Sequence, residues 1–194
     1  MPDVIILWDG PLFFEHMFEE YGITSTIAAP SSINSPHLPP AKLLIVPAGF
    51  TYPEHAIVSN ALANEKIQKK IFNFVENGGV FLMFSPLKEV STCNACRAPA
   101  VTSLLPFGSD VEYVQKDVLI QRESALIGDS DSVYCDGYFQ KFGTDFFVIE
   151  KDDAGRAVHI SKKLGKGQII ISSVHEFLSK TYFESLLSGP KVKL

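Results

Sequence analysis

The amino-acid sequence predicts an α/β fold in which a mostly parallel sheet carries helices on both faces and ends in a C-terminal antiparallel β extension. In the first half of the 194 residues, short apolar runs alternate with stretches of helical periodicity. These runs are apolar throughout, which is typical of parallel strands that are buried on both faces. After residue 87, runs rich in β-forming residues follow one another across turn signals, and this pattern favours antiparallel hairpins.

The first βα unit begins at residues 4–8 (VIILW), an apolar run that predicts a buried strand. Asp9-Gly10-Pro11 follows, and proline is favoured in the first turn of a helix. Apolar residues then recur three and four positions apart, which predicts a helix with one apolar face that ends at Gly22. Residues 23–28 form the second predicted strand. The apolar face comprises Phe14, Met17, Phe18 and Tyr21.

A third buried strand is predicted in "KLLIVPAG" and ends at Pro47-Ala48-Gly49. Residues 65–77 then form a second amphipathic helix, with Asn64 as its N-cap and Gly78 as its terminator. This helix leads into a strand at residues 80–84. Further along, two turn signals at residues 152–155 and 165–167 separate three β-rich runs, and a last helix is expected at about residues 176–187.

Composition favours one globular domain over residues 1–194, because hydrophobic residues make up 46% and charged residues 20%. The net charge is −5 with scattered Lys and Arg, which disfavours a nucleic-acid partner. No window approaches the roughly 20 apolar residues that span a bilayer, so no membrane association is expected. Asp3 stands where a signal peptide would need basic residues, and we expect a cytoplasmic protein.

Five segments stand in a recognisable order: "LLIVPAGFTY", a helix, "FVENGGVFLMFSP", "VYCDGYF" and "GKGQIIISSVHEF". In this order the chain resembles the class I glutamine amidotransferase-like superfamily. It is most similar to the branch shared by the biotin-protein-ligase N-terminal-like domain and ThuA-like proteins. The resemblance covers nearly the whole chain and implies a flavodoxin-like three-layer sandwich formed by residues 1–194.

The resemblance also implies a nucleophile elbow after the strand at residues 80–84, where the family carries a cysteine. Ser85 stands there instead, and Phe84 and Pro86 replace the small residues that flank the family's nucleophile. Pro86 removes a backbone amide that would face the oxyanion, and Pro47-Ala48-Gly49 replaces the family's Pro-Gly-Gly oxyanion turn. We therefore expect no glutaminase activity. The N-cap of a helix that begins at Pro86 is the commoner role for a serine in this position.

The family's general base corresponds to His175 in "SSVHEF". The glutamate that follows it in the family is two residues on, whereas Glu176 is adjacent here, so its side chain leaves the backbone in a different direction. A serine activated by a histidine is the minimal dyad for hydrolysis. A hydrolase that uses Ser85 and His175, with Glu176 beside them, is therefore an alternative to a binding protein without catalytic activity.

Ligand binding is expected in the loops at the carboxyl ends of the strands, where open α/β sheets bind their ligands. Asp9 and Asp136 both precede a glycine in loops expected there, although Asp-Gly is also a common turn sequence. Trp8 is expected in the core, and His16, His37, His55 and His159 have no partner at motif spacing. The candidate ligand-binding residues are Asp9, Gly10, Ala48, Gly49, Tyr52, Tyr134, Asp136 and Gly137.

The three cysteines leave a metal site open as a second alternative, since an odd count argues against a disulfide framework. Cys93 and Cys96 have C-x-x-C spacing, which lets two sulfurs reach one ion from a single loop. Cys135 and His175 could complete a site for zinc or an iron–sulfur cluster. Free reduced thiols would explain the same residues without a cofactor.

The sequence therefore predicts a degenerate amidotransferase-like domain that binds a small-molecule ligand or a protein partner. The hydrolase and the metal protein are the alternatives. A homodimer is compatible with the resemblance, because members of the family often pair through surface helices.

Overall fold

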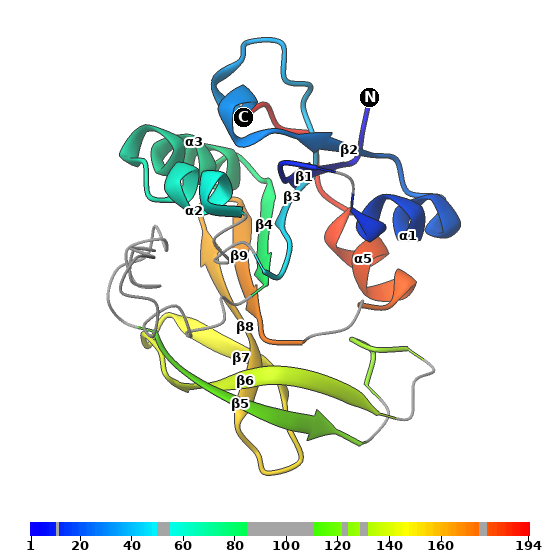
Figure 1. Ribbon diagram of the computed structural model, residues 1–194, viewed down its shortest axis with the longest axis vertical. Coiled ribbons are helices and arrows are strands. Elements are labelled where there is room, and N and C mark those ends of the chain that lie inside the picture. Colours follow the sequence, from blue (N-terminus) through cyan, green and yellow to red (C-terminus); the bar gives the residue numbers. More distant parts are fainter. Residues whose placement is uncertain (11, 50–54, 85–110, 122–123, 129–131, 175–177) are drawn as a thin grey trace.

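One mixed sheet organises the chain (Figure 1). The computed structural model describes residues 1–10, 12–49, 55–84, 111–121, 124–128, 132–174 and 178–194. Within these residues the sheet has nine strands, of which eight follow the order β2-β1-β3-β4-β9-β8-β6-β5, while β7 pairs with β8 beside this path. The predicted α/β class is confirmed.

The first five strands of this order run parallel to one another, and the apolar runs of the sequence form them. They are β1 (Val4–Leu7), β2 (Ser25–Ala28), β3 (Leu43–Val46), β4 (Val80–Phe84) and β9 (Gly167–Ser172). Every residue of β1, β3 and β4 is buried. Such complete burial explains why these segments are apolar at every position and do not alternate with polar residues.

Helices lie on both sides of these parallel strands (Figure 1). On one side are α2 and α3, and on the other are α1 and α5. Their bounds are α1 Phe13–Tyr21, α2 Ala56–Leu62, α3 Glu65–Glu76 and α5 Lys180–Leu186, with a 3-10 helix at Pro30–Asn34. Among the described residues, none of the helices has both the length and the apolar character that crossing a membrane requires.

The other strands are antiparallel: β5 (Glu112–Ile120), β6 (Val133–Lys141), β7 (Phe146–Lys151) and β8 (Ala157–Leu164). Among the described residues, four strand pairs are parallel and four are antiparallel. The sheet is therefore evenly mixed, and the expectation of a mostly parallel sheet is not confirmed. The β7–β8–β9 meander matches the two turn signals, and Gly155 and Gly165 have positive φ in those turns.

The helix ends follow from local chemistry. The Asn64 side chain accepts a hydrogen bond of 2.9 Å from the Lys66 N–H, as predicted for the N-cap of α3. Gly22 ends α1 with φ 71°, and the Ile23 N–H then bonds the Phe18 carbonyl at 2.8 Å. Because Ile23 serves this helix cap, β2 begins at Ser25 and not at residue 23. Ser179 caps α5, which therefore begins at Lys180, later than expected.

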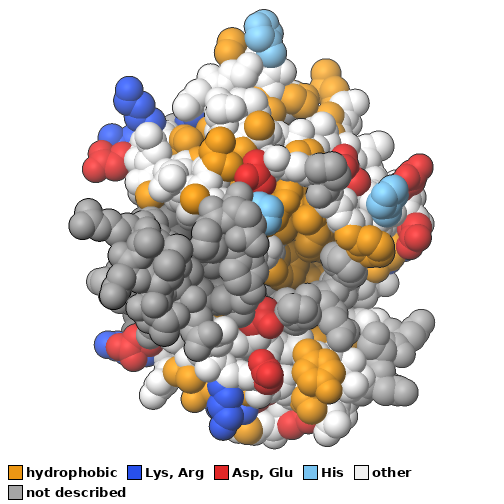
Figure 2. All heavy atoms as spheres, viewed as in Figure 1, with side chains coloured by type: hydrophobic (Ala, Val, Ile, Leu, Met, Phe, Trp, Pro, Cys, Tyr) orange, Lys and Arg blue, Asp and Glu red, His pale blue; other side chains and the backbone are white. Residues whose placement is uncertain are grey.

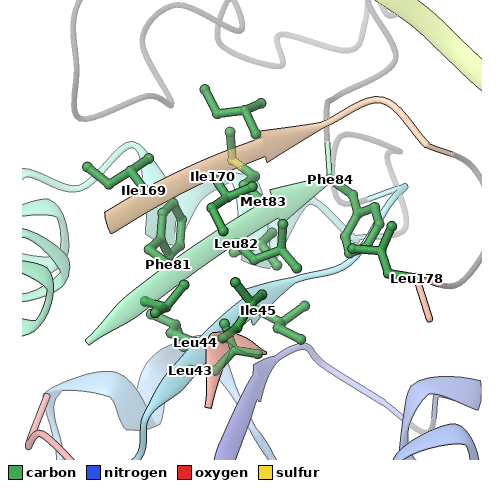
Figure 3. Packing of buried hydrophobic residues seen from close by; sticks show 14 of the residues in the cluster. Leu43, Leu44, Ile45, Phe81, Leu82, Met83, Phe84, Ile169, Ile170 and Leu178 are labelled. Carbon is green, nitrogen blue, oxygen red and sulfur yellow. The ribbon is translucent and has the colours of Figure 1, made fainter. Parts of the chain in front are cut away.

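The core is centred on the parallel strands. Figure 3 shows side chains from β3, β4 and β9 packed closely together, with Phe84 at the end of β4. The largest fully buried side chains include Phe18, Phe74, Phe81 and Phe183, which come from both helical sides and from β4. Trp8 is also buried, as expected. This packing holds the carboxyl ends of β1, β3 and β4 in fixed positions at one edge of the sheet.

Candidate ligand-binding site at the carboxyl edge of the parallel strands

The candidate site begins where β1 and β3 end. These two strands are parallel neighbours, so the residues that follow them emerge at the same edge of the sheet. The chain after β1 enters α1 on one side of the sheet, while the chain after β3 leads to α2 on the other side (Figure 1). Adjacent strands whose connections diverge in this way leave a crevice between them, and open α/β sheets bind ligands there.

Asp9 and His55 form a side-chain pair across this point. The Asp9 Oδ1 and His55 Nδ1 atoms are 3.0 Å apart, although 46 positions separate the two residues. Asp9 lies two residues beyond β1, and His55 directly precedes α2. The side chains of His55 and Asp9 are 29% and 20% exposed, so the pair is partly covered but remains accessible to a ligand.

The Trp8 ring packs against the His55 ring. The two ring centroids lie 4.2 Å apart with an interplanar angle of 39°. Trp8 is only 4% exposed, so the surrounding core restrains its indole. The imidazole therefore lies between this buried ring and the Asp9 carboxylate. A side chain that is restrained on two sides has little rotamer freedom left to lose when a ligand binds.

The contact with Asp9 determines which His55 nitrogen carries a proton. An ionised carboxylate can only accept hydrogen bonds, so Nδ1–H must donate to Asp9 Oδ1. In the neutral imidazole, Nε2 then keeps its lone pair. Within the described part of the chain, neither His55 Nε2 nor Asp9 Oδ2 has a hydrogen-bond partner. The pair therefore offers two neighbouring acceptor atoms.

The turn after β3 borders the same edge. Gly49 has φ 84°, in the left-handed region that glycine adopts readily and other residues rarely do. The Pro47-Ala48-Gly49 stretch is thus a tight turn, with Gly49 buried and Ala48 half-buried. Gly10 follows Asp9 and is also half-buried. The structure accordingly brings four predicted ligand-binding residues to the carboxyl edge of β1 and β3: Asp9, Gly10, Ala48 and Gly49.

Apolar side chains flank this edge. Phe13 in the first turn of α1 is 60% exposed, and Ile57 in the first turn of α2 is 51% exposed. Figure 2 shows a hollow on this side of the molecule with hydrophobic side chains along its floor. Phe14 and Phe84 meet below the surface with ring centroids 5.6 Å apart. A ligand at this edge would therefore find apolar surface next to the Asp9–His55 pair.

The remaining predicted ligand-binding residues of known position lie in β6. The expectation that Asp136-Gly137 forms a loop at a strand end is wrong, because both residues are inside this antiparallel strand. The Asp136 N–H donates to the Ser173 carbonyl at 2.8 Å. A Cβ atom on Gly137 would lie 2.3 Å from the Val114 carbonyl oxygen, so close packing of β5 on β6 requires glycine here. Tyr134 is exposed on the same strand.

Two strand contacts concern the predicted catalytic residues. Phe84, which precedes Ser85, pairs with Ser172, three residues before His175. Cys135 forms a bridge with Val174, which directly precedes His175. The chain segments that lead to Ser85 and His175 therefore run side by side. Six predicted site residues lie outside the described residues: Tyr52, Ser85, Cys93, Cys96, His175 and Glu176.

Of the three cysteines in the metal hypothesis, Cys135 lies within the described residues. This residue is buried in the strand β6. Among the described residues, no three side chains of His, Cys, Asp or Glu are grouped closely enough to hold a metal ion. The candidate ligands Cys93 and Cys96 lie outside that part of the chain.

His55 is the residue that sequence reasoning missed. No motif joins positions 9 and 55, and the contact between them arises only because β1 and β3 are adjacent in the sheet. The one available signal was topological: His55 follows the third strand, and residues after parallel strands meet at one edge. His159, whose Nε2 contacts the Tyr182 hydroxyl, is fully buried on β8.

No family model matches the sequence, and no curated protein resembles it significantly. Solved structures do match. The GH42 β-galactosidase Gan42B from G. stearothermophilus has a TM-score of 0.57 and 16% identity over 96% of this chain, which spans only 30% of that enzyme. The chain likewise spans 31% of an exo-β-1,4-mannosidase from an Opitutaceae bacterium, with a TM-score of 0.53 and 12% identity over 90% of this chain.

A Thermoplasma acidophilum protein assigned as a GMP synthase component has a comparable overall length. It has a TM-score of 0.54 and 13% identity, with 96% of this chain and 92% of that chain covered. At such low identities these similarities show a common fold, and the activities of the matched proteins do not transfer to this chain.

Proposed function

We propose that this chain is a class I glutamine amidotransferase-like domain that binds a small molecule at the carboxyl edge of β1 and β3 and does not hydrolyse glutamine. The order β2-β1-β3-β4-β9 supports the assignment, because 2-1-3-4-5 is the order of flavodoxin-like doubly wound sheets. In such sheets the ligand sits at the point between the first and third strands. The fold shared with the Thermoplasma acidophilum protein assigned as a GMP synthase component is consistent with this assignment.

The Asp9–His55 pair is the observation that carries the proposal. It joins the two loops that diverge from β1 and β3, rests on Trp8, and keeps two acceptor atoms without a partner in the described residues. The two side chains are only partly exposed, which favours a small ligand. A protein partner would need a larger exposed surface for its interface.

We expect no glutaminase activity because of the residues that follow β4 in the sequence. Ser85 replaces the family's cysteine, and Pro86 cannot donate a backbone N–H to an oxyanion. Loss of one oxyanion donor costs about 10²–10³ in kcat in other enzymes, in addition to the loss of the thiolate nucleophile. Incubation with glutamine should therefore release no glutamate above that of a heat-denatured control.

The binding function can be tested by a thermal-shift screen against sugars, nucleotides, amino acids and coenzymes. Hits are then mapped by amide chemical shifts. We expect the compounds that bind to shift the amide resonances around Asp9 and His55. Their affinity should fall for the variants Asp9→Ala and His55→Ala and stay unchanged for His37→Ala, a control at an exposed position. Hits whose shifts map only to other surfaces would contradict the proposal.

A hydrolase that uses Ser85 and His175 is the second candidate. The observation in its favour is the pairing of Phe84 with Ser172, which aligns the segments leading to the two residues. A fluorophosphonate probe should then label wild-type protein but not Ser85→Ala, and His175→Ala should label slowly because the serine would lack its base. Equal labelling of wild type and Ser85→Ala would exclude this candidate.

A further inference from the structure

We infer that the Asp9–His55 pair receives two neighbouring hydroxyl groups of a neutral polyol, one donating to His55 Nε2 and the other to Asp9 Oδ2. This inference rests on the proposed binding function and names the class of ligand. Nothing in the sequence pattern assigned a role to His55. Its role follows from the 3.0 Å contact with Asp9, which leaves an acceptor on each of the two side chains.

The charge of the pair disfavours an anionic ligand. With a neutral imidazole the pair carries the single negative charge of the Asp9 carboxylate, which accepts the 3.0 Å hydrogen bond from His55 Nδ1–H. A phosphate or carboxylate placed here would face negative charge at close range, and no Arg or Lys of the described residues pairs with Asp9 to form the fork that anion sites use. Within the described part of the chain, Asp9 and His55 belong to no group of three side chains that could hold a metal ion.

A hydroxyl group suits the imidazole better than an organic cation does. A hydroxyl both donates and accepts, so it can pair with Nε2 when His55 is neutral and with Nε2–H when His55 is protonated. An ammonium or guanidinium group can only donate, and it would be repelled by the imidazolium form. The neutral polyol is therefore the ligand class that can pair with either form of the imidazole.

The surroundings of the pair fit the apolar part of such a ligand. Phe13 and Ile57 are the exposed hydrophobic residues in the first turns of the two helices that follow β1 and β3. A cyclic polyol has polar edges and C–H-rich faces, and aromatic or aliphatic side chains cover such faces well. The combination of acceptors from Asp9 and His55 with apolar flanks thus matches a cyclic polyol better than a linear charged metabolite.

The first experiment determines the tautomer of His55 by long-range ¹⁵N NMR on histidine-labelled protein. We expect the Nδ1–H form at neutral pH, with the exposed His16 and His37 as internal references in the same spectrum. In Asp9→Ala the carboxylate acceptor is lost, and His55 should shift toward the mixture shown by the references. A wild-type His55 in the Nε2–H form would overturn the inference, because Nε2 would no longer accept.

The second experiment uses two matched probes, cis-1,2-cyclohexanediol and cis-1,2-dimethoxycyclohexane. They share a ring, but only the diol has donor hydrogens. The diol should perturb the His55 side-chain nitrogens in a saturable way, and the dimethoxy compound should not. His55→Phe keeps an aromatic ring against Trp8 but removes the acceptor, so it should weaken diol binding roughly three- to tenfold.

Inorganic phosphate and methylammonium are the competing probes. Saturable shifts at His55 with either of them, but not with the diol, would overturn the polyol assignment, and so would equal binding of the diol and its dimethoxy analogue. The metabolite screen separates this failure from that of the proposed function. A compound that binds at Asp9 and His55 but lacks neighbouring hydroxyl groups would support the proposed binding site and contradict the polyol assignment.

Discussion

His159 on β8 and Tyr182 on α5 are joined by a hydrogen bond of 2.6 Å between the imidazole Nε2 and the phenol oxygen. It links the antiparallel half of the sheet to the last helix. His159 is fully buried, and its Nδ1 has no hydrogen-bond partner among the described residues. Burial lowers the pKa of His159 from 6.5 to about 3 and raises the pKa of Tyr182, so both groups are neutral in the folded protein at pH 7.

The first prediction is that His159 makes the fold acid-sensitive. Because the folded-state pKa lies below the unfolded value, the unfolded chain binds the proton first as the pH falls. The free energy of unfolding should therefore decrease from about pH 6.5 toward pH 3, by up to roughly 1.4 kcal/mol per pH unit from this group. In His159→Gln, which does not titrate, urea unfolding curves should show a smaller decrease over this range. His37→Gln, at an exposed position, should keep the wild-type slope.

The second prediction separates the hydrogen bond from the acid response. Tyr182→Phe removes the phenol oxygen and leaves His159 Nε2 buried without its partner, so the free energy of unfolding should fall by about 1–3 kcal/mol. The slope between pH 6.5 and 4 should persist, because burial causes the pKa shift of His159. Tyr134→Phe, on an exposed side chain, is the control. A loss of the pH slope in Tyr182→Phe would contradict burial as the cause.

The third prediction concerns Gly137 in β6. Alanine there would place its Cβ 2.3 Å from the Val114 carbonyl oxygen and 2.5 Å from the Tyr113 ring, so β5 would have to move. We expect Gly137→Ala to lower the free energy of unfolding by at least about 1–3 kcal/mol, measured by urea denaturation. Gly10→Ala is the matched control, because its Cβ would have no atom within 4 Å. Equal stabilities of the two variants would contradict the packing of β5 on β6.

The parallel strands and α3 were predictable from sequence because their signals are local. Each residue of β3 and β4 is buried, so the apolar runs coincide with the strands. Asn64 lies next to the helix that it caps. The paired strands β5 and β6 were not predicted. In β5 the register shift between Gln115 and Val118 interrupts the alternation that would reveal a strand, and in β6 Asp136-Gly137 has the sequence of a turn.

In the candidate site, too, the residues with local sequence signals were predicted and those that depend on strand order were not. Asp9 was predicted because it directly follows the apolar run of the first strand. Asp136-Gly137 was misinterpreted because Asp-Gly favours turns, whereas here glycine is required by the close approach of Val114 from another strand. His55 reaches Asp9 only through the order of β1 and β3 in the sheet. Contacts that depend on which strands become neighbours leave no periodic trace in one sequence.

The fourth prediction uses Cys135, whose side chain is buried in β6. In the double variant Cys93→Ser and Cys96→Ser it is the single remaining thiol, so its labelling reports on this strand alone. A buried thiol reacts only after the surrounding structure opens, and alkylation by iodoacetamide should therefore be slow in buffer and accelerate with urea.

The metal hypothesis is tested by measuring the zinc and iron content of the wild-type protein and of this double variant. Metal near one equivalent in wild type, lost in the variant, would establish Cys93 and Cys96 as ligands. Rapid alkylation of Cys135 in buffer would instead show that β6 is open at this position, contrary to its pairing with β5.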